Sequence, residues 1–192
     1  MDKNYDILKV ITHADGGKEY SKNVSKYLSN EDSVAVRGYG VDANNPENAQ
    51  KQFDAMAKYF GNEGKNQYIQ YMMSFLKDTA PDAETAMSIA DKIMDPLKDE
   101  HQLYFGAHKK QRGESDFHIH DFVGTTNMKN GKLLYPNNKL NYAMAQRMAD
   151  TIQKPVELVI EKKNKESEQG GEKKNENNDF TRIFYPNNTP KD

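Results

Sequence analysis

Hydrophobic and polar positions follow two different periods along this chain. Some segments alternate between apolar and polar residues, or form short runs rich in β-branched and aromatic residues, and we predict these to be strands. They are residues 7–12, 67–75, 103–108, 117–123 and 156–161. Elsewhere apolar residues recur every three or four positions, which predicts amphipathic helices. The predicted helices are residues 19–30, 46–60, 81–95 and 138–153, and residues 31–45 are predicted to be a loop.

Residues that start and stop helices support two of these predictions. Asn45 can cap a first turn, Pro46 fits the first helical position, and Gly61 can end the same helix. Pro81 and Pro96 mark the start and the end of the next helix. The sequence therefore predicts two helices with well-defined limits.

Two of the predicted strands are close neighbours in the sequence. The polar segment 109–116 fits a hairpin loop between the strands 103–108 and 117–123. The pair Asn130-Gly131 is typical of a tight turn, which would return the chain after the second strand. Strands that alternate with helices around an antiparallel hairpin predict an α+β fold, with a mainly antiparallel central sheet flanked by helices.

The predicted hairpin carries three of the five histidines of the chain. In an extended strand residues i and i+2 lie on the same side, so His118 and His120 share one face, and strand pairing could bring His108 to that face. Three neutral imidazoles facing one point make a site for a borderline divalent ion, with positions left for water or substrate. Such a metal site requires an open sheet face, which could admit a strand of nucleic acid. The alternative is a polar stripe on a half-buried strand.

Composition narrows the class of protein. The chain has 192 residues and a formal net charge of -2, which fits one soluble domain with a sizeable core. The absence of cysteine excludes disulfides and thiolate metal sites. The sequence has no run of about 18 apolar residues and no secretion signal, so we expect no membrane insertion and a cytoplasmic location. A pI near 6.2 argues against coating of nucleic acid by bulk charge, but Lys109, Lys110 and Arg112 can bind phosphates locally.

The last part of the chain has a different composition. Beyond residue 161 the sequence is polar and mixed in charge, with few large apolar residues. Such a segment cannot bury enough apolar surface to offset the entropy lost on ordering. We therefore predict a folded domain over residues 1–161 and a polar, disordered tail over residues 162–192.

Several short motifs occur in an order that resembles one protein family. They are Tyr27-Leu28, Asn45-Pro46, Ala49, Phe53, Phe60-Gly61, Gln67, Ser74-Phe75, His108, His118-Ile119-His120, Asn127 and Gly131-Lys132. In this order and spacing they resemble the relaxase/mobilisation nuclease family, within the wider class of histidine-hydrophobe-histidine endonucleases. The resemblance covers roughly residues 5–161.

The resemblance implies a metal-dependent DNA relaxase, which nicks one strand at the transfer origin of a plasmid or other mobile element during conjugative mobilisation. Tyr27 would attack a phosphodiester and leave a 5′-phosphotyrosyl link, and Tyr20 is the competing nucleophile. The metal, Mg²⁺ or Mn²⁺, would be held by His108, His118 and His120 and would neutralise charge on the phosphate. The implied partners are single-stranded DNA at the transfer origin and accessory mobilisation and coupling proteins.

Further residues receive expected roles around this site. The residues expected to bind DNA are Lys109, Lys110, Arg112 and Gln70, the last of which stands where the family has a histidine. Asp116 or Asp121 would accept a hydrogen bond from an imidazole and fix its tautomer. Exposed aromatic residues such as Tyr68 or Tyr71 could stack on bases.

Two other functions stay open. A rolling-circle replication initiator resembles this pattern but places its nucleophilic tyrosine after the histidine pair, where Tyr142 is the helical candidate. A non-catalytic module that binds DNA at an origin would use the histidines only as structural residues.

Overall fold

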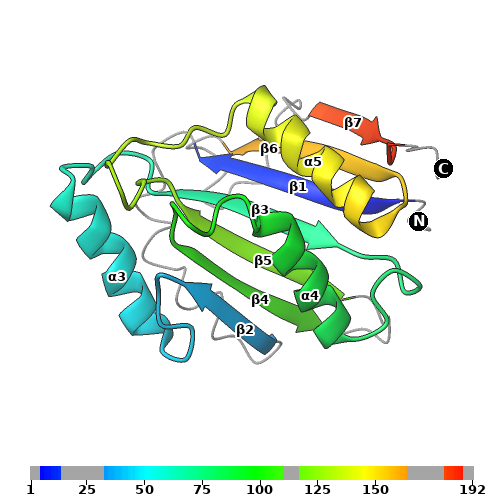
Figure 1. Cartoon of the computed structure of the whole chain (residues 1–192), viewed down its shortest axis with the longest axis horizontal. Coiled ribbons are helices and arrows are strands. Elements are labelled where there is room, and N and C mark those ends of the chain that lie inside the picture. The colour runs from blue at the N-terminus through cyan, green and yellow to red at the C-terminus, as the bar shows by residue number, and fades with distance from the viewer. Residues whose placement is uncertain (1–4, 14–32, 110–116, 164–179, 188–192) are drawn as a thin grey trace, which may run out of the picture.

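Seven strands form one continuous sheet in the computed structural model (Figure 1), which describes residues 5–13, 33–109, 117–163 and 180–187. The strands are β1 (Asp6–His13), β2 (Ser33–Tyr39), β3 (Tyr68–Ser74), β4 (Leu103–Lys109), β5 (Phe117–Gly124), β6 (Val156–Lys163) and β7 (Phe180–Phe184). Their order across the sheet is β2-β4-β5-β3-β1-β6-β7. Neighbouring strands are antiparallel except for β1 and β6, which run parallel. The predicted α+β fold with a mainly antiparallel sheet is therefore confirmed.

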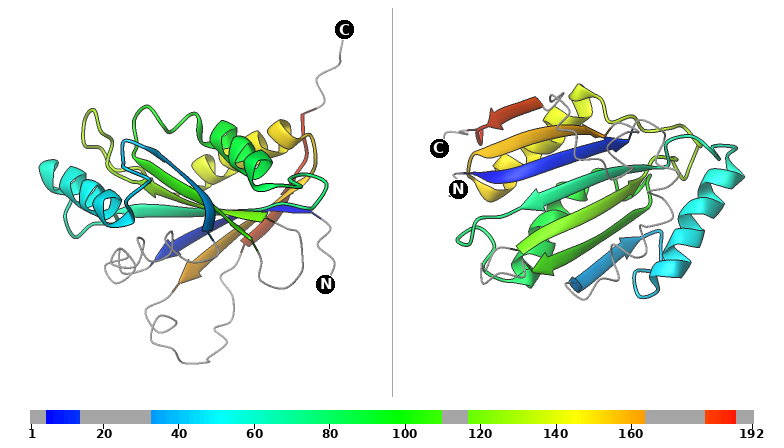
Figure 2. Two further views of the ribbon diagram at one scale, coloured as in Figure 1. Left: turned by 90° about the horizontal axis from the view of Figure 1, so that it is seen from below. Right: turned by 180° about the vertical axis from the view of Figure 1, so that it is seen from behind.

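The helices of the described residues begin at capping side chains. They are α3 (Pro46–Tyr59), α4 (Ala83–Met94) and α5 (Asn138–Ile152). Asn45, Asp82 and Asn137 each accept a hydrogen bond from a backbone N–H of the first turn of these helices. Figure 2 shows α4 and α5 together over one face of the sheet, with α3 at one end. We call the side under α4 and α5 the helix-covered face.

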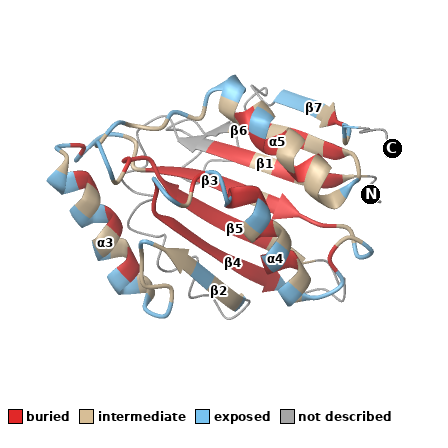
Figure 3. Cartoon of the chain, viewed as in Figure 1, coloured by how far each residue is buried: buried red, intermediate tan, exposed pale blue. Residues whose placement is uncertain are grey.

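The main hydrophobic core lies between the sheet and these two helices. Alternate strand residues supply it, such as Ile69, Tyr71 and Met73 of β3. A smaller cluster lies on the other face, where Phe53 of α3 meets the ring of Tyr68 edge-on at a centroid distance of 5.1 Å. Figure 3 shows that the central strands β3, β4 and β5 are buried along most of their length.

Two predictions about irregular segments are wrong. Residues 33–39, predicted to be part of a loop, form the edge strand β2, in which Arg37 and Gly38 interrupt the apolar alternation. The predicted tail over residues 162–192 contains β7, which pairs with β6 because the phenyl ring of Phe184 packs into the main core. The predicted helix at residues 19–30 lies outside the described residues.

Candidate active site

Strand register brings together the three histidines of the predicted hairpin. His108 of β4 lies directly opposite His118 of β5, and Gly106 lies opposite His120. Residues that are directly opposed point to the same side of a sheet. His108, His118 and His120 therefore share one side, which we call the histidine face. Gly106 has no side chain, which leaves space for the imidazole rings.

The three imidazole rings lie next to one another. Ring centroids are 4.7 Å apart for His108 and His120, 5.0 Å for His118 and His120, and 5.8 Å for His108 and His118. His108 and His120 are only 3% and 7% exposed. Burial, and then the neighbouring His108 and His118, lower the pKa of His120 to about 3. This imidazole is therefore neutral at physiological pH, which is the form that coordinates a metal.

Proximity of the rings is not yet the geometry of a metal centre. Within the described ranges, no group of three or more His, Cys, Asp or Glu side chains is arranged so that it could hold a metal ion. Two ring pairs meet edge to face, at 73° and 76°, and the third is nearly stacked at 22°. A histidine ring turns readily about χ2, so its nitrogens can be redirected without a change in the backbone. The residues fit a divalent ion in their type and spacing, and binding requires the rings to turn.

The other predicted site residues are described only in part. Gln70 lies on the histidine face, opposite Phe122, but is only 3% exposed. Lys109, the last residue of β4, is exposed, but it lies opposite Phe117 and therefore on the helix-covered side. The predicted residues that lie outside the described part of the chain are Tyr20, Tyr27, Lys110, Arg112 and Asp116. The roles of all these residues stay predictions.

Asp121 does not support the histidines. It follows His120 in an extended strand and therefore lies on the helix-covered face. Both of its carboxylate oxygens are buried without a hydrogen-bond partner among the described residues. Burial raises the pKa of this carboxyl well above its ordinary value. The prediction that Asp121 fixes an imidazole tautomer is wrong, because the alternation of the strand separates the two side chains.

The two tyrosines predicted to stack on bases are buried. Tyr68 and Tyr71 are 4% and 0% exposed. The Tyr68 hydroxyl accepts a hydrogen bond from Gln50 Nε2 at 2.6 Å. The prediction was wrong because β3 is a central strand of the sheet and is packed on both faces.

Tyr142 packs against β7 and lies far from the histidines. Its ring centroid is 5.5 Å from that of Phe184 and 6.1 Å from that of Phe180, and the guanidinium of Arg182 lies 5.0 Å from the ring centroid. Figure 1 shows the helix that carries it, α5, on the same side of the sheet as α4, and strand register places the imidazoles on the other side. The sheet therefore separates Tyr142 from the three histidines.

Two charged residues near the histidines had no predicted role. Lys9 of β1 forms an ion pair with Glu161 of β6, and their side chains are 28% and 26% exposed. Lys9 lies opposite Met72 of β3, and Met72 lies opposite His120. No local sequence signal specifies that β1 pairs with both β3 and β6, so the sequence could not place Lys9 in this row.

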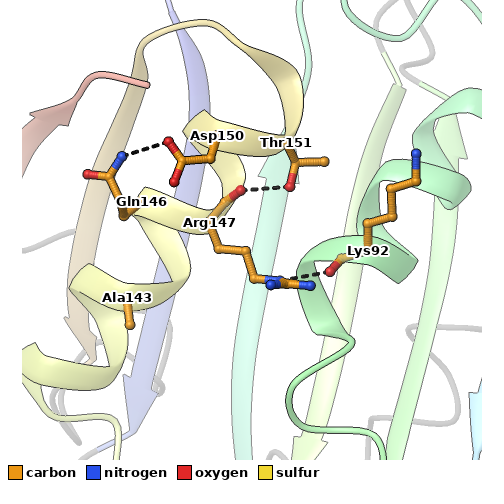
Figure 4. Close-up of a pocket in the computed structure, with 6 residues that line it drawn as sticks. All are labelled: Lys92, Ala143, Gln146, Arg147, Asp150 and Thr151. Carbon is orange, nitrogen blue, oxygen red and sulfur yellow. Dashed lines mark hydrogen bonds between the residues drawn. The ribbon is translucent and has the colours of Figure 1, made fainter. Parts of the chain in front are cut away.

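A hollow of about 590 Å³ lies on the other side of the sheet, between α4 and α5 (Figure 4). It is lined by Lys92, Ala143, Gln146, Arg147, Asp150 and Thr151. Its residues bond to one another: Arg147 Nε donates to the Lys92 carbonyl at 2.9 Å, and Gln146 Nε2 donates to Asp150 Oδ1 at 3.0 Å. The hollow is lined by no histidine and lies across the sheet from the imidazoles, so it is separate from the histidine cluster.

The sequence that folds into this sheet matches the model of a known family. That family is described as Relaxase: MobA/VirD2-like, nuclease domain, and the match covers residues 20–158. The chain belongs to this family. The matched region is well over half of the chain and contains all three clustered histidines. A comparison with curated proteins gives no match.

Membership of the family defines the activity in general terms. A relaxase nuclease domain nicks DNA during mobilisation, and its substrate is DNA at a transfer origin. Such domains generally depend on a metal ion, which agrees with the residue types of the histidine cluster. None of the helices in the described ranges has the length and apolar character needed to cross a membrane.

Proposed function

We propose that this relaxase cuts one DNA strand at the transfer origin of a plasmid or another mobile element by direct attack of Tyr27. The observation that carries the proposal is the cluster of three neighbouring imidazoles on the histidine face. It supplies nitrogen ligands beside a sheet surface, and a phosphodiester must be held and partly neutralised before an oxygen nucleophile can approach it.

The proposed step exchanges one phosphate ester for another. The Tyr27 oxygen forms a bond to phosphorus while the bond from phosphorus to the 3′ oxygen breaks. The phenol proton is lost to a base or to water, and the 3′ oxygen takes up a proton. The 5′ phosphate stays on the tyrosine. Because a phenol has a pKa of about 10, it is a good leaving group when a 3′-hydroxyl attacks in the reverse step.

We infer that His108, His118 and His120 hold the divalent ion. When bound, the ion neutralises charge on a non-bridging phosphate oxygen. Of the two predicted ions, Mg²⁺ prefers oxygen ligands and keeps its water shell, whereas first-row transition ions accept imidazole more readily. We therefore rank Mn²⁺ above Mg²⁺ for this site.

Residues around the histidines would hold the DNA strand. Lys109 is exposed at the end of β4, on the helix-covered side, and we propose that it binds phosphates at the rim of the sheet together with Lys110 and Arg112. Gln70 would need to become exposed before it could bond to DNA, and Asp116 would orient an imidazole. Accessory mobilisation and coupling proteins would bring the covalent complex to a transfer apparatus.

One alternative loses support from the structure. A rolling-circle initiator would use a tyrosine after the histidine pair, and the helical candidate, Tyr142, packs on the opposite side of the sheet. The other alternative is a module that binds origin DNA without cutting it. It differs from the relaxase in one measurable property, since it forms no covalent product.

The proposal is tested with labelled single-stranded oligonucleotides that tile the DNA flanking the gene. The protein is incubated with each of them and Mn²⁺ or Mg²⁺, and the products are separated under denaturing conditions. We expect one oligonucleotide to form a denaturation-resistant adduct with the wild-type protein. Tyr27→Phe should abolish the adduct, and Tyr20→Phe is the matched control that should retain it.

Two results would contradict the proposal. Binding of the oligonucleotides with no adduct under either metal supports the non-catalytic module. An adduct that survives Tyr27→Phe but is lost in Tyr20→Phe moves the nucleophile to the other tyrosine.

A further inference from the structure

We propose that Lys9 binds a backbone phosphate of the DNA strand, next to the phosphate held at the histidines. The inference rests on the proposed nicking function, and it adds a binding position on β1, a strand that lies before the region matched by the family model. It assigns a path to the substrate, which would cross the sheet from β5 over β3 to β1.

Strand register gives the position of Lys9 relative to His120. His120, Met72 and Lys9 form one row across three neighbouring strands of the histidine face. Adjacent strands are about 4.8 Å apart, so Lys9 lies about 10 Å from His120 along the row. This is a separation of backbone positions, which the lysine side chain partly spans, and the proposal places the Lys9 ammonium on the phosphate next to the one at the histidines.

The residue between them fits the same path. Met72 is half-buried and presents an apolar, flexible side chain between the imidazole and the ammonium group. A nucleic-acid strand alternates charged phosphates with less polar sugars and bases. The row therefore offers nitrogen ligands, an apolar surface and a cation in the order in which a strand would meet them.

Charge on this face singles out Lys9. Among the described side chains on the histidine face of the sheet, Lys9 is the only lysine or arginine, and the facing carboxylates are Glu157 and Glu161. Lys9 is ion-paired with Glu161. A partly exposed ion pair of this kind contributes little to stability. The Lys9 ammonium can therefore exchange the Glu161 carboxylate for a phosphate. Glu161 then acts as a competitor that repels the DNA.

A structural role for the same ion pair makes the opposite prediction. If the pair only ties β1 to β6, removal of either partner should have the same effect on every property. If Lys9 binds phosphate, then Lys9→Met should weaken DNA binding while Glu161→Gln should strengthen it. Opposite changes in DNA affinity for the two variants therefore support phosphate binding by Lys9, and equal changes support a purely structural ion pair.

The experiment measures binding of a fluorescent oligo(dT) of about 20 nucleotides by anisotropy at several salt concentrations, without metal and with Mn²⁺. The variants are Lys9→Met, Lys9→Arg and Glu161→Gln. The matched control is Lys98→Met, which also removes an ion-paired lysine of similar side-chain exposure, 31% against 28%, but on the helix-covered side. Thermal unfolding of each variant confirms that it is folded.

We expect Lys9→Met to weaken binding by about three- to tenfold and to lower the salt slope by about 0.7, which is the value for one lost phosphate contact on a single strand. Glu161→Gln should bind more tightly than wild type, Lys9→Arg should bind like wild type, and Lys98→Met should change neither value. The inference is overturned if Lys9→Met behaves like Lys98→Met, or if Lys9→Met and Glu161→Gln change binding in the same direction.

Failure of the inference can be told apart from failure of the proposed function. If the wild-type protein forms the covalent adduct but Lys9→Met leaves the DNA affinity and its salt slope unchanged, only the proposed role of Lys9 is wrong. If the wild-type protein binds DNA and never forms an adduct, the nicking function falls, and the Lys9 result then describes a DNA-binding surface alone. A wild-type protein that does not bind oligo(dT) at all overturns the Lys9 contact.

Discussion

The two faces of β5 use polar residues in opposite ways. On the helix-covered face, Asp121 lies between Ile119 and Val123, which are fully buried, and its oxygens have no hydrogen-bond partner in the described part of the chain. On the histidine face, His118 and His120 lie against a third imidazole from β4. The difference shows that strand register decides whether a polar residue in a buried strand has polar side chains of the same kind beside it.

Two buried aspartates on the helix-covered face, Asp6 and Asp121, also differ from each other. Asp6 of β1 is also fully buried, but its Oδ1 accepts a hydrogen bond from the Leu76 N–H at 2.8 Å and its Oδ2 accepts one from Thr79 Oγ1 at 3.0 Å. Asp6 therefore holds the segment after β3 in place, whereas Asp121 holds nothing. The following predictions test whether catalysis depends on one face and stability on the other.

The largest expected effect is that of a lost histidine. His120→Ala should reduce adduct formation by about 100-fold or more, because the metal site loses one of three ligands. The rate of adduct formation and a metal titration measure this effect. The matched control is His101→Ala, since the His101 ring bonds to the Gly124 carbonyl at 2.8 Å, at the other end of the strands. Wild-type metal affinity in His120→Ala would remove the metal site from the histidine face.

Metal binding should also stabilise the fold. At about 100 times its dissociation constant, Mn²⁺ should raise the free energy of unfolding by about 2.7 kcal/mol, since it binds the folded state alone. Mg²⁺ should do so less well, and a chelator should reverse the gain. Thermal unfolding with each ion measures it, and His120→Ala should show no gain. Equal stabilisation of the wild type and His120→Ala would mean that the ion binds elsewhere.

Substitution of Asp6 should affect stability and spare catalysis. Asp6→Ala should lower the free energy of unfolding by about 2 kcal/mol, because the part-buried Leu76 N–H and the Thr79 hydroxyl lose their acceptor. Urea denaturation gives the change, and the rate of adduct formation per folded molecule should stay that of the wild type. A change below about 0.5 kcal/mol would show that the bond to Leu76 is readily replaced by water.

Substitution of Asp121 should have the opposite sign. Asp121→Val should raise the free energy of unfolding by about 1 kcal/mol, since it replaces a buried carboxyl that lacks a partner by an apolar side chain suited to a strand. Metal affinity should not change. Loss of metal binding in this variant would show that Asp121 influences the histidines across the sheet.

The smallest expected effect is a pH dependence from Asp6. Burial raises its pKa, and this outweighs the hydrogen bonds from Leu76 and Thr79, which lower it. The folded state therefore binds more protons than the unfolded state between the ordinary pKa and the raised one, so this group makes stability fall as pH rises through that interval. Asp6→Asn lacks the effect, and its stability relative to wild type should increase over that range. A constant difference between the two proteins across pH would contradict it.

The sequence predicted correctly those elements that are marked by helix caps or by apolar alternation within a few residues. The caps at Asn45 and Pro46 marked α3, and the alternation at residues 117–123 marked β5. Strands β2 and β7 were missed because edge strands need few apolar residues, and Phe184 alone anchors the end of β7 in the main core. The parallel pairing of β1 with β6 was not foreseen, since pairing between distant strands leaves no local mark.

The candidate site shows the same limit. The hairpin predicted the approach of His108 to His118 and His120, because two neighbouring strands determine that register. Which side Asp121 occupies also follows from alternation, but the pattern alone did not show that α4 and α5 cover this side. Lys9 enters the row of His120 only through β3, so its position depends on two strand pairings that no short motif encodes.

Strand β7 has a practical consequence for protein production. It lies beyond the region that the family model matches, and it supplies the outer hydrogen-bonding partner of β6. A shortened version that stops at residue 163 would leave the outer edge of β6 without its pairing strand and would expose the ring of Tyr142. Such a bare edge recruits strands from other molecules, so a trimmed protein should precipitate or self-associate where the longer one stays dispersed.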